Sequence, residues 1–284
     1  MRWQGQGESE NVEDRRGMRP VAVGGGIIGI IIVLVGAYFG IDLKPLAQQV
    51  GGGGGQMQQV GPPPDPKALE FAKSILYLTE DVWTDQFRKN NYGEYEKPKM
   101  VLFSEQVETG GCGTAPSAVG PFYCPGDRKV YLDPTFFDEL EQKLGGSKAD
   151  FSKAYVIAHE VGHHVQNLLG YSDRVRQFEK REGKNGSVRL ELQADYLAGV
   201  WAHYGQEKFK FIDPGDVDSA LTTANAIGDD RIMKNAGRWP SPEKFTHGSS
   251  KQRVKFFRQG LETGDFSKRK LDTFFDPNVN PLEL

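Results

Sequence analysis

Apolar and polar residues divide this chain into stretches of three kinds. Residues 21–41 form a run without a charged side chain, bounded by Pro20 and Asp42. Residues 42–66 are rich in glycine and proline, as flexible or extended linkers are. From Lys67 onward apolar residues recur at the three- and four-residue steps typical of amphipathic helices. The pattern therefore predicts an apolar segment, a linker and one folded domain.

The domain of residues 67–284 is expected to be α+β, mostly α, with a small sheet near its beginning. Its roughly 218 residues are enough for one well-buried core. The hydrophobic periodicity predicts helices over residues 65–89, 134–144, 152–169, 172–181, 188–204, 217–233 and 250–264. Alternating or short apolar runs predict strands over residues 100–107, 122–123 and 129–132.

Two histidines and a glutamate have zinc-ligand spacing in the run His159-Glu160-Val161-Gly162-His163. On a helix, His159 and His163 leave the same face and can converge on one metal ion. Glu160 lies one position round, where it can reach a metal-bound water but is poorly placed as a ligand. The alternative is a helix whose polar face carries these residues by chance. Because the surrounding residues are largely apolar, unpaired imidazoles there would be costly, which favours a metal site.

The expected third ligand is Glu191, in the helix predicted over residues 188–204. Glu191 and Asp195 are four residues apart and share a helix face, and Ser187 is the expected N-cap. Three protein ligands would leave a fourth position open for water, as in catalytic zinc sites. Asp195 would accept the N–H of a ligating imidazole and fix its tautomer.

The residues after the second histidine distinguish classes of zinc peptidase. The longer metzincin pattern requires glycine and histidine at positions that Gln166 and Leu169 occupy here, so that class is excluded. A distant Glu191 followed by Asp195 resembles the gluzincins instead.

Further strings resemble the bacterial neutral zinc metallopeptidases (the YpfJ-like family) almost from end to end. They are residues 159–166, 191–195 and 198–202 around the predicted metal site, 2–7 at the amino terminus and 246–250 near the carboxyl terminus. The resemblance implies a zincin-like metallopeptidase domain with one Zn²⁺ per chain. It also implies a polypeptide or peptide substrate.

The predicted reaction is zinc-dependent hydrolysis of a peptide bond. Glu160 would take a proton from the metal-bound water and deliver it to the leaving amine. His247 is a candidate for stabilising the developing oxyanion, as a distal His or Tyr does in other zincins; the alternative is a structural loop histidine. Residues 129–133 match the zincin strand that aligns substrate by edge pairing, unless they form an interior strand.

Two other functions stay open. One is a catalytically silent zinc-binding scaffold or interaction protein of the cell envelope. The other is a hydrolase of cell-wall peptides. Nucleic-acid binding is not expected, because the formal net charge is −3 and the basic residues are dispersed.

The apolar run predicts attachment to the bacterial cytoplasmic (inner) membrane. Residues 21–41 would span about 31 Å as a helix, enough to cross the hydrocarbon core. Residues 15–19 contain three arginines, whereas residues 42–66 contain one basic residue, Lys44. This asymmetry predicts a cytoplasmic tail over residues 1–20, a single-pass signal anchor, and a periplasmic domain. A cleaved signal peptide is the alternative, although no small-x-small cleavage site is evident.

Four glycines fall on one narrow stripe of the predicted membrane helix. They are Gly25, Gly29, Gly36 and Gly40. Small residues at this spacing allow two membrane helices to approach closely, which predicts a homodimer. A glycine-rich helix without a partner is the alternative.

The two cysteines of the chain, Cys112 and Cys124, are expected to form a disulfide outside the cytoplasm. A second metal site is the weaker alternative, because C-x-x-C spacing is absent. Among the other histidines, His164 is expected to pack or cap rather than bind metal. His203 is expected to be a polar residue near the surface.

Overall fold

The computed structural model describes residues 1–17, 64–182, 186–241, 244–276 and 278–279. The helices are α3 (Pro66–Lys89), α4 (Phe136–Leu144), α5 (Asp150–Leu168), α6 (Tyr171–Glu182), α7 (Gly186–Phe209), α8 (Asp216–Ala226), α9 (Asp229–Asn235), α10 (Ser250–Thr263) and α11 (Lys268–Asp272). The 3-10 turns are η1 (Ser117–Val119) and η3 (Thr273–Phe275). The strands are β1 (Val12–Asp14), β2 (Lys99–Leu102), β3 (Gln106–Glu108), β4 (Thr114–Pro116), β5 (Phe122–Cys124) and β6 (Lys129–Leu132).

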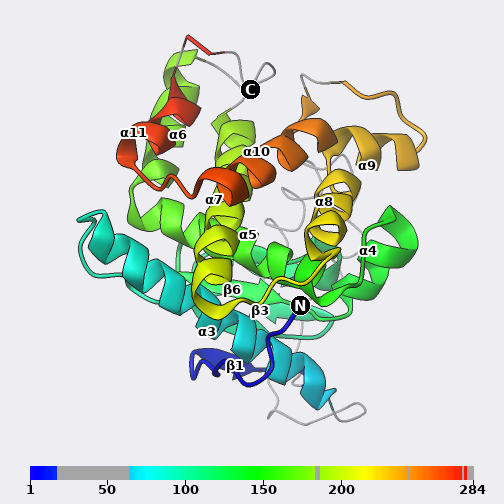
Figure 1. The fold of residues 1–284 in the computed structure, drawn as a ribbon. Coiled ribbons are helices and arrows are strands. Elements are labelled where there is room, and N and C mark those ends of the chain that lie inside the picture. Colours follow the sequence, from blue (N-terminus) through cyan, green and yellow to red (C-terminus); the bar gives the residue numbers. More distant parts are fainter. Residues whose placement is uncertain (18–63, 183–185, 242–243, 277, 280–284) are drawn as a thin grey trace.

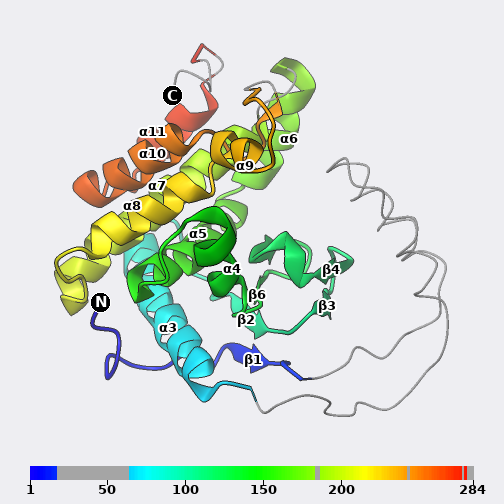
Figure 2. The ribbon, with the colours of Figure 1, turned by 90° about the vertical axis from the view of Figure 1, so that its right-hand side faces the viewer.

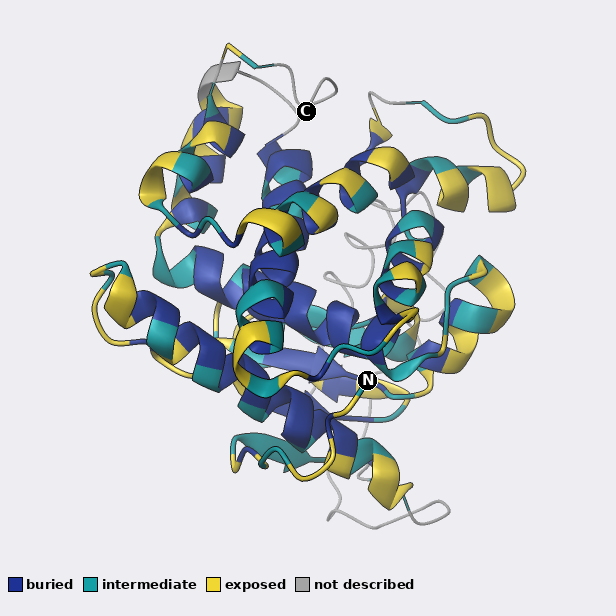
Figure 3. Cartoon of the chain, in the orientation of Figure 1, coloured by how far each residue is buried: buried dark blue, intermediate teal, exposed yellow. Residues whose placement is uncertain are grey.

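The helices are stacked on one small sheet (Figures 1 and 2). Helix α5 packs on β5 and β6 and also on α7, and α10 packs on α7. Buried residues concentrate in α5, α7 and the sheet, whereas α4 and α9 carry much of the exposed surface (Figure 3). The α+β, mostly helical architecture expected from the sequence is therefore confirmed at this level.

The main sheet has the order β1-β2-β6-β5. Strands β1, β2 and β6 are parallel, and β5 is antiparallel to β6. Strand β6 therefore lies inside the sheet, so of the two alternatives left open for residues 129–133 the structure has the interior strand. Strands β1 and β5 are the two edge strands, and β5 runs beside α5.

The predicted strand over residues 100–107 is divided between two sheets. Strand β2 ends at Leu102, and β3 pairs with β4 in a separate antiparallel ribbon. Between them Glu105 adopts a left-handed conformation (φ 63°), and its N–H donates to Asp133 Oδ2 (3.1 Å). This turn redirects the chain, and the apolar pattern alone did not reveal it.

Helices α7 and α10 are in backbone contact. A Cβ at Gly260 would lie 2.0 Å from the carbonyl oxygen of Tyr196, and one at Gly199 would lie 2.1 Å from that of Phe257. Only glycine fits at these two positions, and the close approach fixes α10 against the helix that carries Glu191.

Two helix boundaries differ from the prediction. The expected helix over residues 217–233 breaks at Gly228, where a Cβ would lie 2.3 Å from the backbone nitrogen of Ser250. Helix α7 begins at Gly186, so Ser187 lies inside the helix and is not its N-cap; its N–H donates to Glu179 Oε1 (3.1 Å).

Residues 1–17, the N-terminal strap, pack on the domain. Trp3 Nε1 donates to Asp150 Oδ2 in the first turn of α5 (2.8 Å), and β1 extends the sheet beside β2. Arg16 Nη1 donates to the carbonyl oxygen of Asp65, directly before α3 (2.9 Å). The two flanks of residues 18–63 thus meet at one place.

No helix in the described ranges is both long and apolar enough to cross a bilayer. The expected anchor (residues 21–41), its four glycines and the linker up to residue 63 lie outside the described residues. The membrane span and the homodimer therefore stay predictions.

Candidate metal centre

The two imidazoles and the carboxylate proposed as ligands converge between α5 and α7. His159, His163 and Glu191 each offer one ligand atom, and these atoms lie within 4.8 Å of one another. Glu191 Oε2 lies 3.2 Å from His159 Nε2, and Glu191 Oε1 lies 3.4 Å from His163 Nε2. Gly162 allows this convergence, because a Cβ there would be 3.1 Å from the carbonyl oxygen of Ala194 on α7.

The charges of the site favour a cation. Burial would raise the pKa of Glu191, but the two imidazoles hold it well below its usual range. Burial would likewise lower the pKa of His159, but Asp195 and Glu191 raise it to about 10. The carboxylates thus stabilise positive charge between them, as imidazolium or as a metal ion. Two imidazole nitrogens and one carboxylate oxygen are a donor set that zinc accepts.

Asp195 has the neighbour that the sequence predicted. It is fully buried, and its Oδ1 accepts the Nδ1–H of His159 (2.9 Å). The same oxygen accepts the hydroxyl of Tyr155 (2.5 Å), and Oδ2 accepts Nε–H of Arg253 (2.9 Å). Burial would raise the pKa of Asp195, but the Arg253 guanidinium lowers it. Asp195 is therefore an anion that can orient His159 with Nε2 toward Glu191.

The contacts of Asp195 with Tyr155 and Arg253 were not predicted from the sequence. Arg253 is 3% exposed and comes from α10, where Phe256 and Phe257, three and four residues later, are buried on the same face. A charge on an apolar helix face was the available signal, because such a charge needs a buried partner.

A cavity of about 840 Å³ lies over the predicted ligands. Glu160, 8% exposed, lines it beside His159 and His163, and burial raises the pKa of its carboxyl group. Much of the remaining lining is apolar, contributed by η1, β5, α4, α5 and α9.

His247 also lines this cavity. Asp229 Oδ2 accepts the backbone N–H groups of Thr246 and His247 (2.7 Å each) and of Gly248 (3.1 Å), which fixes the loop. The Nδ1 atom of His247 is 3.2 Å from Asp229 Oδ1, and the His247 side chain is 43% exposed. The structure thus brings His247 to the cleft that contains Glu160.

The other two histidines lie away from the ligands, as expected. His164 Nε2–H donates to the carbonyl oxygen of Glu96 (2.6 Å), and its Nδ1 is 3.0 Å from the Tyr123 hydroxyl. Burial lowers the pKa of His164 to about 4. His203 Nδ1 is 2.8 Å from the carbonyl oxygen of Leu261, so this partly exposed residue links α7 to α10.

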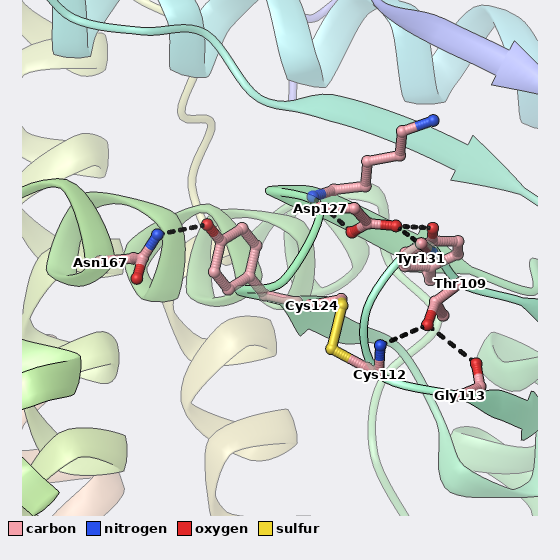
Figure 4. Close-up of a disulfide and its surroundings, with 10 residues drawn as sticks. Thr109, Cys112, Gly113, Cys124, Asp127, Tyr131 and Asn167 are labelled. Carbon is pink, nitrogen blue, oxygen red and sulfur yellow. Dashed lines mark hydrogen bonds between the residues drawn. A yellow bond between two sulfur atoms is a disulfide. The ribbon is translucent and has the colours of Figure 1, made fainter.

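The predicted disulfide between Cys112 and Cys124 is present (Figure 4). It joins β5, which lines the cavity, to the loop between β3 and β4. Thr109 Oγ1 accepts the N–H of Cys112 (2.7 Å) and donates to the carbonyl oxygen of Gly113 (2.8 Å), which closes the loop around the bridge.

The comparisons with known proteins identify the family of this chain. The family model described as "Putative neutral zinc metallopeptidase" matches residues 1–274. The protein YpfJ of Escherichia coli (strain K12) is 44% identical over 280 residues, covering 93% of this chain and 96% of YpfJ. Rv2575 of Mycobacterium tuberculosis (strain H37Rv) is 48% identical over 180 residues, covering 60% of this chain and 61% of that protein. No solved structure matches, so the zincin-like fold is not confirmed by a structural neighbour. The chain belongs to the family of neutral zinc metallopeptidases.

Proposed function

We propose that this protein is a zinc-dependent metalloendopeptidase whose nucleophile is a water activated by Glu160. The observation that carries the proposal is the convergence of His159, His163 and Glu191 within 4.8 Å, beside a buried glutamate in one cleft. Neither a structural zinc site nor a surface cluster needs an adjacent buried base.

His159, His163 and Glu191, which line the cleft, would hold the ion. A bound Zn²⁺ would lower the pKa of a water and polarise the scissile carbonyl. Glu160 would accept a proton from a water in the cleft, which its raised pKa favours, and would pass it to the leaving amine nitrogen. His247, held by Asp229 at the same cleft, would donate a hydrogen bond to the developing oxyanion.

The cleft suits an extended peptide with bulky apolar side chains. Phe122, Val156 and Ile232 line it, and β5 presents one free edge of the sheet toward it. Backbone groups at a free edge can pair with an extended segment, and the apolar wall would then receive alternate side chains of that segment.

The test is Glu160→Gln in the full chain. Zinc content, measured by atomic absorption, should stay at one ion per chain, while hydrolysis of unfolded protein should fall at least about 100-fold, because general base catalysis is lost. Glu262→Gln, an exposed change on α10, is the control and should retain both properties. Hydrolysis that survives in pure Glu160→Gln protein would contradict the assignment.

The same assay separates the two alternatives. Unfolded proteins, peptide mixtures and cell-wall peptides are incubated with and without chelator. Bound zinc without cleavage of any substrate would favour the silent scaffold. Chelator-sensitive cleavage of wall peptides alone would favour the cell-wall hydrolase.

For the location, we propose an extracytoplasmic domain that contacts the cytoplasmic membrane through residues 21–41. The disulfide supports an oxidising compartment. The packing of the N-terminal strap argues against a tail left in the cytoplasm, because β1 pairs with β2 of the domain itself. We therefore propose that strap and domain occupy the same side of the membrane.

Thiol labelling of intact cells tests this sidedness. Gln4→Cys and Glu262→Cys place single thiols on exposed positions of the strap and of α10. A membrane-impermeant reagent should label both. Labelling of Glu262→Cys alone, with Gln4→Cys reactive only after lysis, would restore the single-pass topology.

A further inference from the structure

Gln166 is a buried amide that touches both helices of the metal site. Its side chain is fully buried on α5, one turn after His163. Its Oε1 lies 2.9 Å from His163 Nδ1. Its Nε2 donates to the carbonyl oxygen of Leu190 (2.7 Å) and to Gln193 Oε1 (3.0 Å), both on α7.

The partners on α7 determine which way this amide points. The Leu190 carbonyl can only accept a hydrogen bond, so the nitrogen end of Gln166 must face α7. The side-chain amide of Gln193 has a fixed orientation as well, because its Nε2 donates to the carbonyl oxygen of Leu271 (2.9 Å). Its Oε1 therefore accepts the hydrogen bond from Gln166. The oxygen end of Gln166 therefore faces His163.

This direction fixes the tautomer of His163. An amide oxygen accepts but cannot donate, so Nδ1 of His163 must carry the proton. The lone pair is then on Nε2, the atom that lies 3.4 Å from Glu191 Oε1. Leu190, which receives the other end of the amide, directly precedes Glu191 in the chain.

We infer that Gln166 is a positioning residue of the metal centre, which holds Nε2 of His163 ready for the ion and keeps α5 in register with Glu191. The inference rests on the zinc site of the proposed function, but not on hydrolysis. It gives the two ligand histidines different supports: His159 has the Asp195 anion, whereas His163 has a neutral amide.

Glutamate could not replace Gln166 without loss. A carboxylate would still accept the N–H of His163, but its second oxygen would face two acceptors, the Leu190 carbonyl and Gln193 Oε1. Leucine has nearly the size of glutamine and removes both contacts. Gln166→Glu thus removes the contacts to α7 alone, and Gln166→Leu removes these and the contact to His163.

The experiment measures zinc affinity of the full chain by competition with a chromophoric chelator. Both variants should bind zinc about 10- to 100-fold more weakly than the unchanged protein, as losses of such supporting contacts do. The matched control is Gln86→Leu, a buried glutamine on α3 whose change should alter zinc affinity less than about twofold. Circular dichroism checks that each variant is folded.

A spectroscopic readout tests the tautomer without any substitution. In the zinc-loaded protein, ¹⁵N-edited histidine spectra should show His163 bound through Nε2, with a slowly exchanging proton on Nδ1. Coordination of zinc through Nδ1 of His163 would overturn the inference. An Nδ1 proton that exchanges as fast as the ring proton of a solvent-exposed histidine would overturn it too. Affinities unchanged in both folded variants would overturn it as well and would leave the proposed function intact. Absence of zinc binding by the unchanged protein would overturn both.

Discussion

The two walls of the cleft are built in different ways. The wall with the ligands consists of α5, α7 and α10, which pack closely enough that backbones touch at Gly199 and Gly260. The opposite wall consists of residues 106–125 and is closed by the disulfide. It shares a small separate hydrophobic cluster with β2 and β6, formed by Val101, Phe103, Val107, Cys124 and Tyr131. We therefore expect the arrangement of the candidate ligands to depend on helix packing, and the position of β5 to depend on the disulfide.

The largest effect is expected from Gly260→Ala in the helical wall. Its Cβ would be 2.0 Å from the carbonyl oxygen of Tyr196, so α10 must move away from α7. We expect the free energy of unfolding to fall by about 3 kcal/mol in urea titrations, because overpacking at backbone contacts cannot relax by side-chain rotation. Arg258→Ala, an exposed change on the same helix, should alter stability by less than about 0.5 kcal/mol. Equal stability of the two variants would remove the distinction between the walls.

A smaller effect on stability is expected at His164, which joins the two walls through the Tyr123 hydroxyl and also donates to the Glu96 carbonyl. Burial lowers the pKa of His164 in the folded protein to about 4, whereas its pKa in the unfolded chain is near 6.5. Between these two pH values the unfolded chain therefore binds more protons than the folded protein does. His164 therefore contributes stability that is complete above about pH 6.5 and is lost as the pH falls toward 4.

The measurement compares unfolding free energies at pH 7 and pH 5 for the unchanged protein and His164→Gln. The unchanged protein should lose about 2 kcal/mol more than the variant over this interval. The other titrating groups are present in both proteins, so the difference isolates His164. Parallel pH dependences would show that the junction between the walls is not sensitive to this proton.

The smallest effect is expected from removal of the disulfide, and it should be confined to the wall formed by residues 106–125. In the double variant Cys112→Ser/Cys124→Ala we expect kcat/KM on peptides to fall about tenfold, because β5 is held less firmly in place. Its zinc affinity should stay within about twofold of that of the unchanged protein. Reductant should reproduce the effect in the unchanged protein and add nothing in the double variant. A parallel loss of zinc would mean that the walls are not independent.

The sequence predicted the clustering of the candidate ligands better than it predicted the sheet. His159, His163, Glu191 and Asp195 could be placed because helical spacing determines which side chains share a face. The pairing of β6 between β2 and β5 depends on contacts between distant segments, which periodicity does not encode. The turn at Glu105 was missed for the same reason, since a tertiary contact to Asp133 stabilises it.

The contacts that support the ligands could be found only in three dimensions. Arg253 lies 58 residues from Asp195 in the chain, and the contact depends on how α10 packs on α7. Gln166 was visible as part of a family string, but its role depends on the opposing carbonyl of Leu190. The N-terminal strap has no amphipathic period, so its place beside β2 was not predictable from the pattern.

The contact between Arg16 and Asp65 has a practical consequence for producing the protein. Because these residues lie side by side, a short glycine-serine bridge could replace everything between them and yield a compact version that is easy to purify. Trimming the chain from its beginning up to residue 63, the usual way to remove an apolar leader, would instead strip β1 from the sheet and leave β2 with a bare edge prone to aggregation.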